Sequence, residues 1–158
     1  MKVADVMATN LRTCPPGAAL ADVAEMAAAL DLGTVPITDQ RGKLLGVITQ
    51  RDLCRLLQKD PEKLTGLTAR DILRTDEPTC APGENVREVL CRLRQMRVRQ
   101  MPVLDREGRL LGMLSLSDLI LFARHEPAES DLSDLEVMRV IQAISACRCT
   151  SVRSHLRD

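Results

Sequence analysis

The chain has 158 residues, 45% of them hydrophobic, and equal numbers of basic and acidic side chains, 22 of each. This length suffices for one domain or for two small domains that share a core, and the balanced charge favours neither nucleic acid nor an anionic membrane surface as a partner. The polar start of the chain has no signal-peptide pattern and no apolar run reaches the ~20 residues of a membrane helix, so we expect a cytoplasmic protein.

An internal repeat is the most informative feature of the chain. Residues 5–53 align without a gap on residues 71–119, a shift of 66 positions (71 − 5 = 66). Two copies are fewer than a repeat array needs, so the pattern predicts a duplicated folding unit with approximate two-fold symmetry. Such a pair has two equivalent clefts, which are common ligand sites. Identical pairs include Thr13/Thr79, Pro16/Pro82, Pro36/Pro102, Gly46/Gly112 and Asp52/Asp118.

The first half of each copy predicts a short helical turn, an extended stretch and a longer helix. The turns are expected over 3–8 and 69–74, and the extended stretches lie near Thr13 and Thr79. A Pro-Gly pair then turns the chain into a helix whose apolar residues recur at helical spacing. These residues are Leu20, Val23, Ala27 and Leu30 in the first copy, and Val86, Val89, Leu90, Leu93 and Met96 in the second.

The second half of each copy predicts a hairpin and a closing helix. The strands are expected over 34–38 and 43–49, and over 100–104 and 109–115, with an Asp-to-Gly turn inside each pair. The closing helices begin at Gln50 and Leu116. Each copy therefore has the order helix, strand, helix, strand, strand, helix, which is an α/β (α+β) fold with pseudo-two-fold symmetry.

The domain organisation follows from the repeat. Residues 1–58 are predicted to be the first repeat, 59–68 a polar linker, 69–124 the second repeat and 125–158 a helical extension. A C-terminal helix is expected from about 131 to the low 150s, with Ser130 and Asp131 as caps. Its apolar positions are Leu132, Leu135, Met138, Ile141 and Ile144.

A candidate ligand-binding motif occurs where the last strand of each copy meets the closing helix. The motif consists of a glycine, two apolar residues, a residue with a hydroxyl group, two variable residues and an aspartate. In the first copy it runs from Gly46 through Thr49 to Asp52, and in the second from Gly112 through Ser115 to Asp118. Glycine permits close approach of a backbone or ligand. A hydroxyl and free amides at a helix N-terminus suit a phosphate, and the Asp can accept hydrogen bonds from a ribose diol. The same spacing is also an ordinary capping box, so capping is the alternative.

Residues 1–122, about three-quarters of the chain, resemble a tandem pair of CBS domains, named from cystathionine beta-synthase and also called a Bateman module. The resemblance is carried by Val3–Met7, Thr13–Gly17, Val35–Asp39, Gly42–Thr49 and Arg51–Leu53, each with its partner in the second copy. It implies a regulatory module that binds an adenosine derivative (AMP, ADP, ATP or S-adenosylmethionine) in the clefts between repeats, and that pairs into a homodimer. No obligatory cofactor is implied.

The resemblance also implies which residues form each site. One cleft would combine Thr49 and Asp52 with Thr79 and 99–103. The other would combine Ser115 and Asp118 with Thr13 and 33–37. The nucleotide-contacting residues implied in the two strand segments are Thr34, Val35, Ile37, Arg99, Met101 and Val103, with the apolar ones beside the adenine.

The two implied clefts differ in charge. Arg97 and Arg99 precede the strand of the first, where a phosphate chain would run, whereas Asp31 and Gly33 stand at the equivalent positions of the second. We therefore expect the Thr49–Asp52 cleft to take the charged nucleotide. The alternative is that these arginines form a solvated helix end.

Other function classes find little support in the sequence. The six cysteines include no CxxC pair and predict reduced thiols, mostly buried; Cys147 and Cys149 lack further metal ligands. No catalytic constellation predicts an enzyme, and the arginine-rich stretch has no aromatic residues to stack bases. We interpret the chain as a sensor of an adenosine ligand that regulates a partner protein. The alternative is a structural dimerisation or scaffold module without a physiological ligand.

Overall fold

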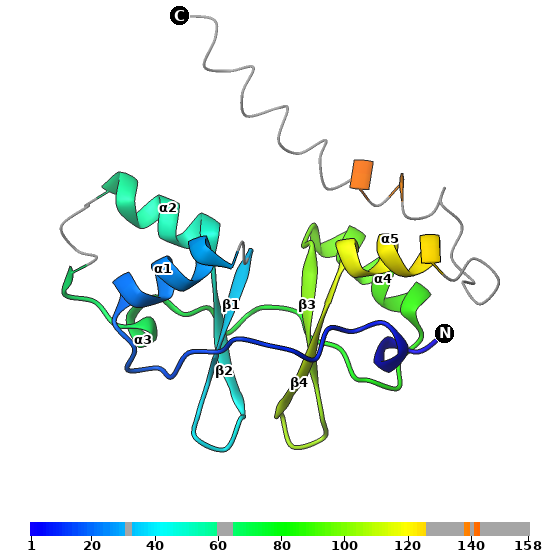
Figure 1. Ribbon diagram of the computed structural model, residues 1–158, viewed down its shortest axis with the longest axis horizontal. Helices are drawn as coiled ribbons and strands as arrows, with labels where there is room; N and C mark the ends of the chain where they lie inside the picture. The colour runs from blue at the N-terminus through cyan, green and yellow to red at the C-terminus, as the bar shows by residue number, and fades with distance from the viewer. Residues whose placement is uncertain (31–32, 60–64, 126–137, 140, 143–158) are drawn as a thin grey trace, which may run out of the picture. The chain divides into compact units, whose positions relative to one another are not determined.

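The computed structural model describes residues 1–30, 33–59, 65–125, 138–139 and 141–142 (Figure 1). Its elements are η1 (Val3–Asp5), α1 (Leu20–Ala29), β1 (Thr34–Thr38), β2 (Leu44–Thr49), α2 (Gln50–Lys59), α3 (Ala69–Ile72), α4 (Val86–Met96), β3 (Gln100–Leu104), β4 (Leu110–Ser115) and α5 (Leu116–His125). The predicted order of helices and hairpins is confirmed, whereas the first predicted strand of each copy is only an isolated bridge, of Cys14 with Ile37 and of Cys80 with Val103. Most of the predicted C-terminal helix lies outside the described residues.

The chain folds into two compact units that cut across the sequence repeats. The unit that contains Thr49, here the Thr49 unit, comprises residues 10–77 and 104–110. The unit that contains Ser115, here the Ser115 unit, comprises residues 1–9, 78–103 and 111–158. The opening segment of each repeat therefore packs with the body of the other repeat.

The Thr49 unit is built on the antiparallel β1–β2 hairpin, which pairs Thr34 with Thr49 and Ile37 with Gly46. The helices α1 and α2 lie beside this hairpin (Figure 1). The extended segment before α1 adds a parallel bridge between Cys14 and Ile37. Burial of apolar area is the main stabilising term of such a core. The core includes Leu20, Val23, Val35, Ile37, Ile48 and Leu53.

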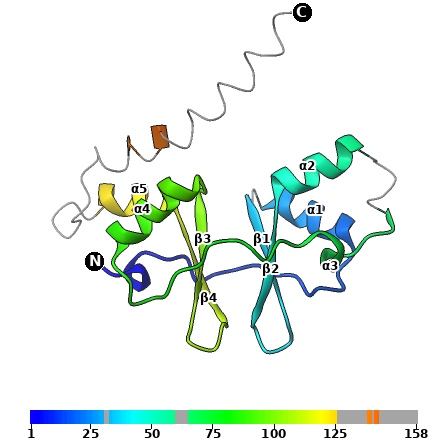
Figure 2. The same cartoon turned by 180° about the vertical axis from the view of Figure 1, so that it is seen from behind.

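The short helix α3 closes the Thr49 unit next to the start of α1 (Figure 2). The Ala69 amide donates to the Ala18 carbonyl at 2.9 Å, and the Leu20 amide donates to the Leu67 carbonyl at 2.9 Å. Ala69 is fully buried in the core. These contacts fix the second repeat's opening segment onto the first repeat's core.

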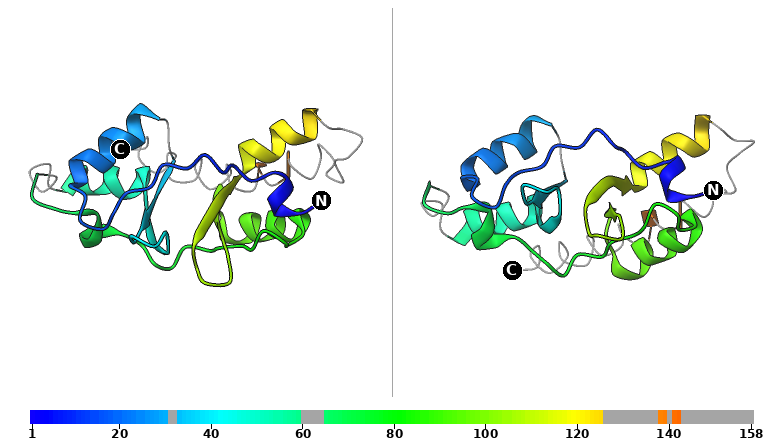
Figure 3. Two further views of the ribbon diagram at one scale, coloured as in Figure 1. Left: turned by 60° about the horizontal axis from the view of Figure 1, so that its bottom comes forward. Right: turned by 90° about the horizontal axis from the view of Figure 1, so that it is seen from below.

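The Ser115 unit has the same plan, with the β3–β4 hairpin, α4 and α5. Here the η1 turn lies against the segment that leads into α4 (Figure 3), since the Val3 amide donates to the Glu84 carbonyl at 3.0 Å. Val3 is fully buried. The core of this unit includes Val3, Val86, Val89, Leu93, Met101, Val103, Leu114 and Leu119.

The opening turns are shorter than predicted because the chain leaves them to pair with a strand. The predicted turn 69–74 ends at Ile72, and the next residues bring Arg74 beside β2, where its amide and carbonyl bond to those of Val47 at 2.8 and 2.9 Å. The predicted turn 3–8 ends at Asp5, and Ala8 bonds to Met113 in the same way, at 2.9 Å in both directions.

The repeated glycine makes this pairing possible. A Cβ added to Gly46 would lie 2.4 Å from the Arg74 carbonyl oxygen, and one added to Gly112 would lie 2.9 Å from the Ala8 carbonyl oxygen. Both distances are too short for any residue other than glycine without a backbone shift. The close approach predicted at these glycines is therefore that of a backbone.

Other departures from the predicted elements occur at element ends. Leu30 and Met96 occupy the apolar spacing of their helices but are 46% and 51% exposed, because they stand at the helix C-termini. The strands β2 and β4 begin one residue later than predicted, after Lys43 and Arg109, which form an isolated bridge with each other. In the described part of the chain, no helix has both the length and the apolar content to cross a bilayer.

Candidate functional site

The Thr49–Asp52 motif lies at the end of β2 and the first turn of α2. The Thr49 hydroxyl donates to Asp52 Oδ2 at 2.5 Å, and the Thr49 amide donates to the same oxygen at 3.0 Å. The Asp52 amide donates back to the Thr49 hydroxyl at 3.2 Å. Both residues are half-buried. This is the reciprocal capping box that the sequence left as one interpretation of the motif.

The Ser115–Asp118 motif has the same geometry at the start of α5. The Ser115 hydroxyl and amide donate to Asp118 Oδ2 at 2.6 and 3.0 Å, and the Asp118 amide donates to the hydroxyl at 3.1 Å. The first helical amide is also satisfied at both motifs: Gln50 donates to the Gly33 carbonyl and Leu116 to the Arg99 carbonyl. The duplication is thus preserved down to individual hydrogen bonds.

Capping leaves part of each carboxylate unused. In the described residues, the hydrogen bonds of Asp52 and Asp118 use Oδ2 and none uses Oδ1. A carboxylate oxygen accepts about two hydrogen bonds, so Oδ1 retains its full capacity for a diol or an amide. Capping and ligand contact are therefore compatible at the same Asp.

A third capping box, Thr68 with Asp71, shows the same arrangement at α3. The Thr68 amide and hydroxyl donate to Asp71 Oδ2 at 2.7 and 2.8 Å. These bonds lower the pKa of the Asp71 carboxyl. The sequence Thr-x-x-Asp alone therefore does not identify a ligand site, and Asp71 serves as an internal comparison for Asp52.

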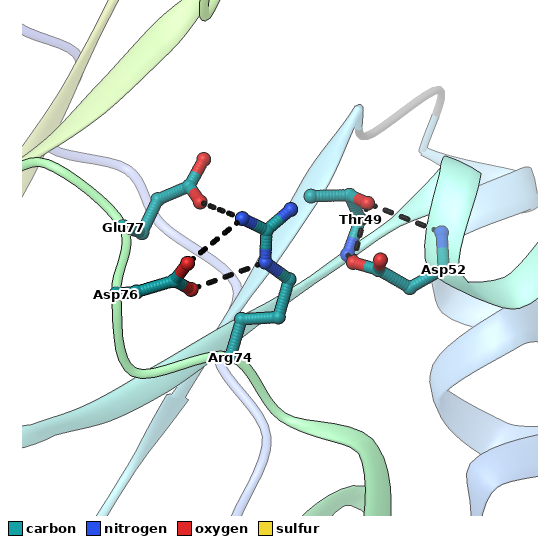
Figure 4. A network of polar contacts seen from close by, with 5 residues as sticks. All are labelled: Thr49, Asp52, Arg74, Asp76 and Glu77. Atoms are coloured by element: carbon teal, nitrogen blue, oxygen red, sulfur yellow. Dashed lines mark hydrogen bonds and ion pairs between the residues drawn. The ribbon is translucent and has the colours of Figure 1, made fainter. Parts of the chain in front are cut away.

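A charged network lies beside the Thr49–Asp52 motif (Figure 4). Arg74 Nε and Nη2 donate to the two carboxylate oxygens of Asp76 at 3.2 and 3.3 Å, and Nη2 lies 3.7 Å from Glu77 Oε2. The pKa of Asp76 is lowered by the hydrogen bond from Arg74. Burial raises the pKa of Glu77, which the charge of Arg74 partly offsets. The pKa of Arg74 is raised mainly by its hydrogen bond to Asp76, and the charge of Asp52 adds to this rise.

Arg74 is a residue that the sequence reasoning did not select. The shift of 66 positions aligns it with Ala8, and it is the last residue of the predicted opening turn. Its importance arises from the pairing of its backbone with Val47, two residues before Thr49. The glycine at position 46, together with this unmatched cation, is the sequence signal that would have identified it.

The remaining predicted site residues are distributed over both units. Val35, Ile37, Met101 and Val103 are fully buried in the core of their own unit. Thr13, Thr79 and Arg99 are exposed, and Thr34 is half-buried. Thr13, Thr34, Val35 and Ile37 belong to the Thr49 unit, whereas Thr79, Arg99, Met101 and Val103 belong to the Ser115 unit. Their assignment to a ligand site stays a prediction.

The cysteines are divided between core and surface. Cys14 and Cys80 are buried, Cys54 and Cys91 are exposed, and all four are free thiols. The expectation of mostly buried cysteines thus holds for two of these four. Burial raises the pKa of the Cys80 thiol to about 11. Cys147 and Cys149 lie outside the described residues, and within those residues no group of three His, Cys, Asp or Glu side chains has metal-site geometry.

Two kinds of relative share sequence with the chain. The inosine-5′-monophosphate dehydrogenase of Mycobacterium leprae is 31% identical over 125 residues, which are 79% of this chain and 23% of the dehydrogenase. The homoserine O-acetyltransferase of Methanococcoides burtonii is 27% identical over 117 residues, 74% of this chain and 23% of that protein. The chain therefore spans about a quarter of the length of these relatives.

Two solved structures match nearly over their whole length. AcuB from Vibrio cholerae superposes with a TM-score of 0.73 at 27% identity and covers 84% of this chain and 98% of its own. CBSX2 of Arabidopsis thaliana, solved in complex with AMP, superposes with a TM-score of 0.72 at 25% identity and covers 80% of this chain and 98% of its own. The CBS domain model matches residues 3–59 and 69–125. With the duplicated motif and this shared fold, the match shows that the chain belongs to the CBS domain family, as a tandem pair.

Proposed function

We propose that the chain is a cytoplasmic regulatory module that binds an adenosine-containing ligand (AMP, ADP, ATP or S-adenosylmethionine) at its two hydroxyl-x-x-Asp motifs. The supporting observation is that Asp52 and Asp118 are both held by capping bonds through Oδ2, while no group of the described residues bonds to Oδ1. A ribose diol can donate to such a fixed carboxylate. The similarity to CBSX2, solved with AMP, supports an adenosine derivative as the ligand.

The rest of each site is proposed from the family resemblance. Thr79 and Arg99 would contribute to the Thr49–Asp52 site, and Thr13 and Thr34 to the Ser115–Asp118 site. Because the apolar side chains at 35, 37, 101 and 103 are fully buried, the strands would contact an adenine through their backbone groups.

The proposed regulation is a linkage effect. A ligand changes the activity of a partner only if it binds two arrangements of the module with different affinity, and the shift is limited by that difference. The family resemblance favours a homodimer as the functional form. The second candidate is a scaffold without a ligand, which the third capping box favours because Thr68 and Asp71 form the same bonds.

Thermal unfolding of the full chain with each ligand in turn tests the proposal. A ligand that binds only the folded state raises the free energy of unfolding by about 2.7 kcal/mol at a hundred times Kd, enough to raise Tm by several degrees. The double variant Asp52→Ala/Asp118→Ala is expected to lose this rise, whereas Asp71→Ala, which removes an equivalent capping carboxylate, is expected to keep it. Equal ligand shifts in both variants, or no shift with any ligand in the native protein, would support the scaffold.

A further inference from the structure

Arg74 is fixed beside the Thr49–Asp52 motif by its backbone. Its amide and carbonyl bond to Val47, and Gly46 leaves room for its carbonyl oxygen. Side chains two residues apart in a strand point to the same face, so Val47 and Thr49 share one face of β2. The position of the Arg74 backbone thus does not depend on its side chain, and a substitution that shortens or neutralises that side chain leaves the pairing intact.

The guanidinium of Arg74 is only partly used. Its bonds to Asp76 and Glu77 engage Nε and Nη2, and within the described residues Nη1 has no partner. Figure 4 shows the terminal nitrogen without a dashed line on the side of Thr49. The side chain as a whole is 40% exposed. A guanidinium offers five donors in a fixed fork, which matches the oxygens of a phosphate or a carboxylate.

The two carboxylates behind Arg74 orient it and also limit its attraction for anions. When all four groups are ionised, Asp52, Asp76 and Glu77 carry three negative charges against one positive charge on Arg74. A ligand anion at Nη1 therefore gains a charged hydrogen bond but is repelled by the neighbouring carboxylates. Removing the Asp76 charge is expected to strengthen anion binding without moving the guanidinium's backbone.

We infer that Arg74 is a specificity-determining residue of the Thr49–Asp52 site, where its free Nη1 edge binds an anionic group attached to the 5′ side of the adenosine. This inference rests on the proposed function and adds a charge preference to one of its two sites. The aligned positions of the other copy are Ala8, Asn10 and Leu11 in place of Arg74, Asp76 and Glu77. The Ser115–Asp118 site lacks this cation, although Ala8 pairs with Met113 just as Arg74 pairs with Val47.

Titration calorimetry of the full chain with matched charged and uncharged ligands tests the inference. AMP is compared with adenosine, which lacks only the anionic phosphate. The variants are Arg74→Gln and Asp76→Asn, with Arg70→Gln as the control because Arg70 is an exposed arginine on α3 of the same unit. Circular dichroism melts check that each variant is folded.

The expected result is that Arg74→Gln weakens binding of the anionic member of a pair by about tenfold and changes binding of the uncharged member by less than about twofold. Asp76→Asn is expected to strengthen binding of the anionic member, and Arg70→Gln to change neither. If Asp52→Ala lowers the number of ligands bound per chain from two to one while Arg74→Gln has no effect, or weakens both members of a pair equally, the role of Arg74 is wrong and the proposed function stands. If the native protein binds none of AMP, ADP, ATP and S-adenosylmethionine, both are wrong.

Discussion

Replacing Gly46 with alanine tests the pairing that brings Arg74 to the motif. The new Cβ would lie 2.4 Å from the Arg74 carbonyl oxygen and 2.5 Å from Leu73 Cδ1, and the first of these is a backbone atom that cannot rotate away. Gly46 does not have a positive φ, so the cost is steric rather than conformational. The segment must move and weaken its two hydrogen bonds to Val47, at about 0.5–1.5 kcal/mol each. Overpacking of Leu73 adds about 1–3 kcal/mol.

We therefore expect Gly46→Ala to lower the free energy of unfolding by about 1–5.5 kcal/mol, after about 0.4–1 kcal/mol is returned by the stiffer unfolded chain. For a chain of this size, Tm should fall by about 2–4 °C per kcal/mol. Urea unfolding followed by circular dichroism measures the change. Gly17→Ala is the matched control, because a Cβ at Gly17 meets nothing within 4 Å. Equal stability of the two variants would refute the steric reasoning.

Three further predictions concern capping, the core and the thiols. Hydrogen bonds from Thr68 lower the pKa of the folded Asp71 carboxyl, so the stability that this carboxylate contributes is present above its unfolded pKa and is lost as the pH falls through its folded pKa. When the pH is lowered below about 4, the Asp71→Asn variant should therefore lose less free energy of unfolding than the native protein, as measured by urea titrations. Leu93→Ala should lower the free energy of unfolding by about 2–5 kcal/mol, because Leu93 is fully buried in the Ser115 unit. Iodoacetamide at pH 8, read by peptide mass spectrometry, should label exposed Cys54 well before Cys80, whose pKa burial raises to about 11; faster labelling of Cys80 would show that the Ser115 unit opens.

The sequence was sufficient for the elements but not for their partners. Helical spacing predicted the long helices, and the Asp-to-Gly turns supported the hairpins. Gly42 and Gly108 in these turns both adopt a positive φ. The repeat could not indicate that η1 packs with the second copy and α3 with the first. The two copies have nearly the same apolar pattern, so either core accepts either opening segment as far as local sequence is concerned.

The charged network was beyond sequence reasoning for a related reason. Arg74, Asp76 and Glu77 lie in a short irregular segment, where no periodicity assigns a side chain to a face. The sequence instead indicated Arg97 and Arg99 as the phosphate-binding cations, because they precede a recognisable strand. What distinguishes Arg74 is a backbone pairing with Val47 that depends on Gly46, and such a long-range pairing becomes visible only in the fold.

The capping bonds and the proposed ligand contacts at Asp52 support each other. A free Asp side chain loses rotamer freedom when a ligand binds, and this ordering lowers affinity. At Asp52 that freedom is already lost to the two bonds from Thr49, which hold Oδ2 and leave Oδ1 in a fixed direction. Asp71 has the same fixed geometry, but the charge that acts on it is that of Arg70, whereas Asp52 is coupled by charge to Arg74 and Glu77. Capping therefore supplies a preorganised carboxylate at all three boxes, and the charges around each box decide which of them suits a nucleotide.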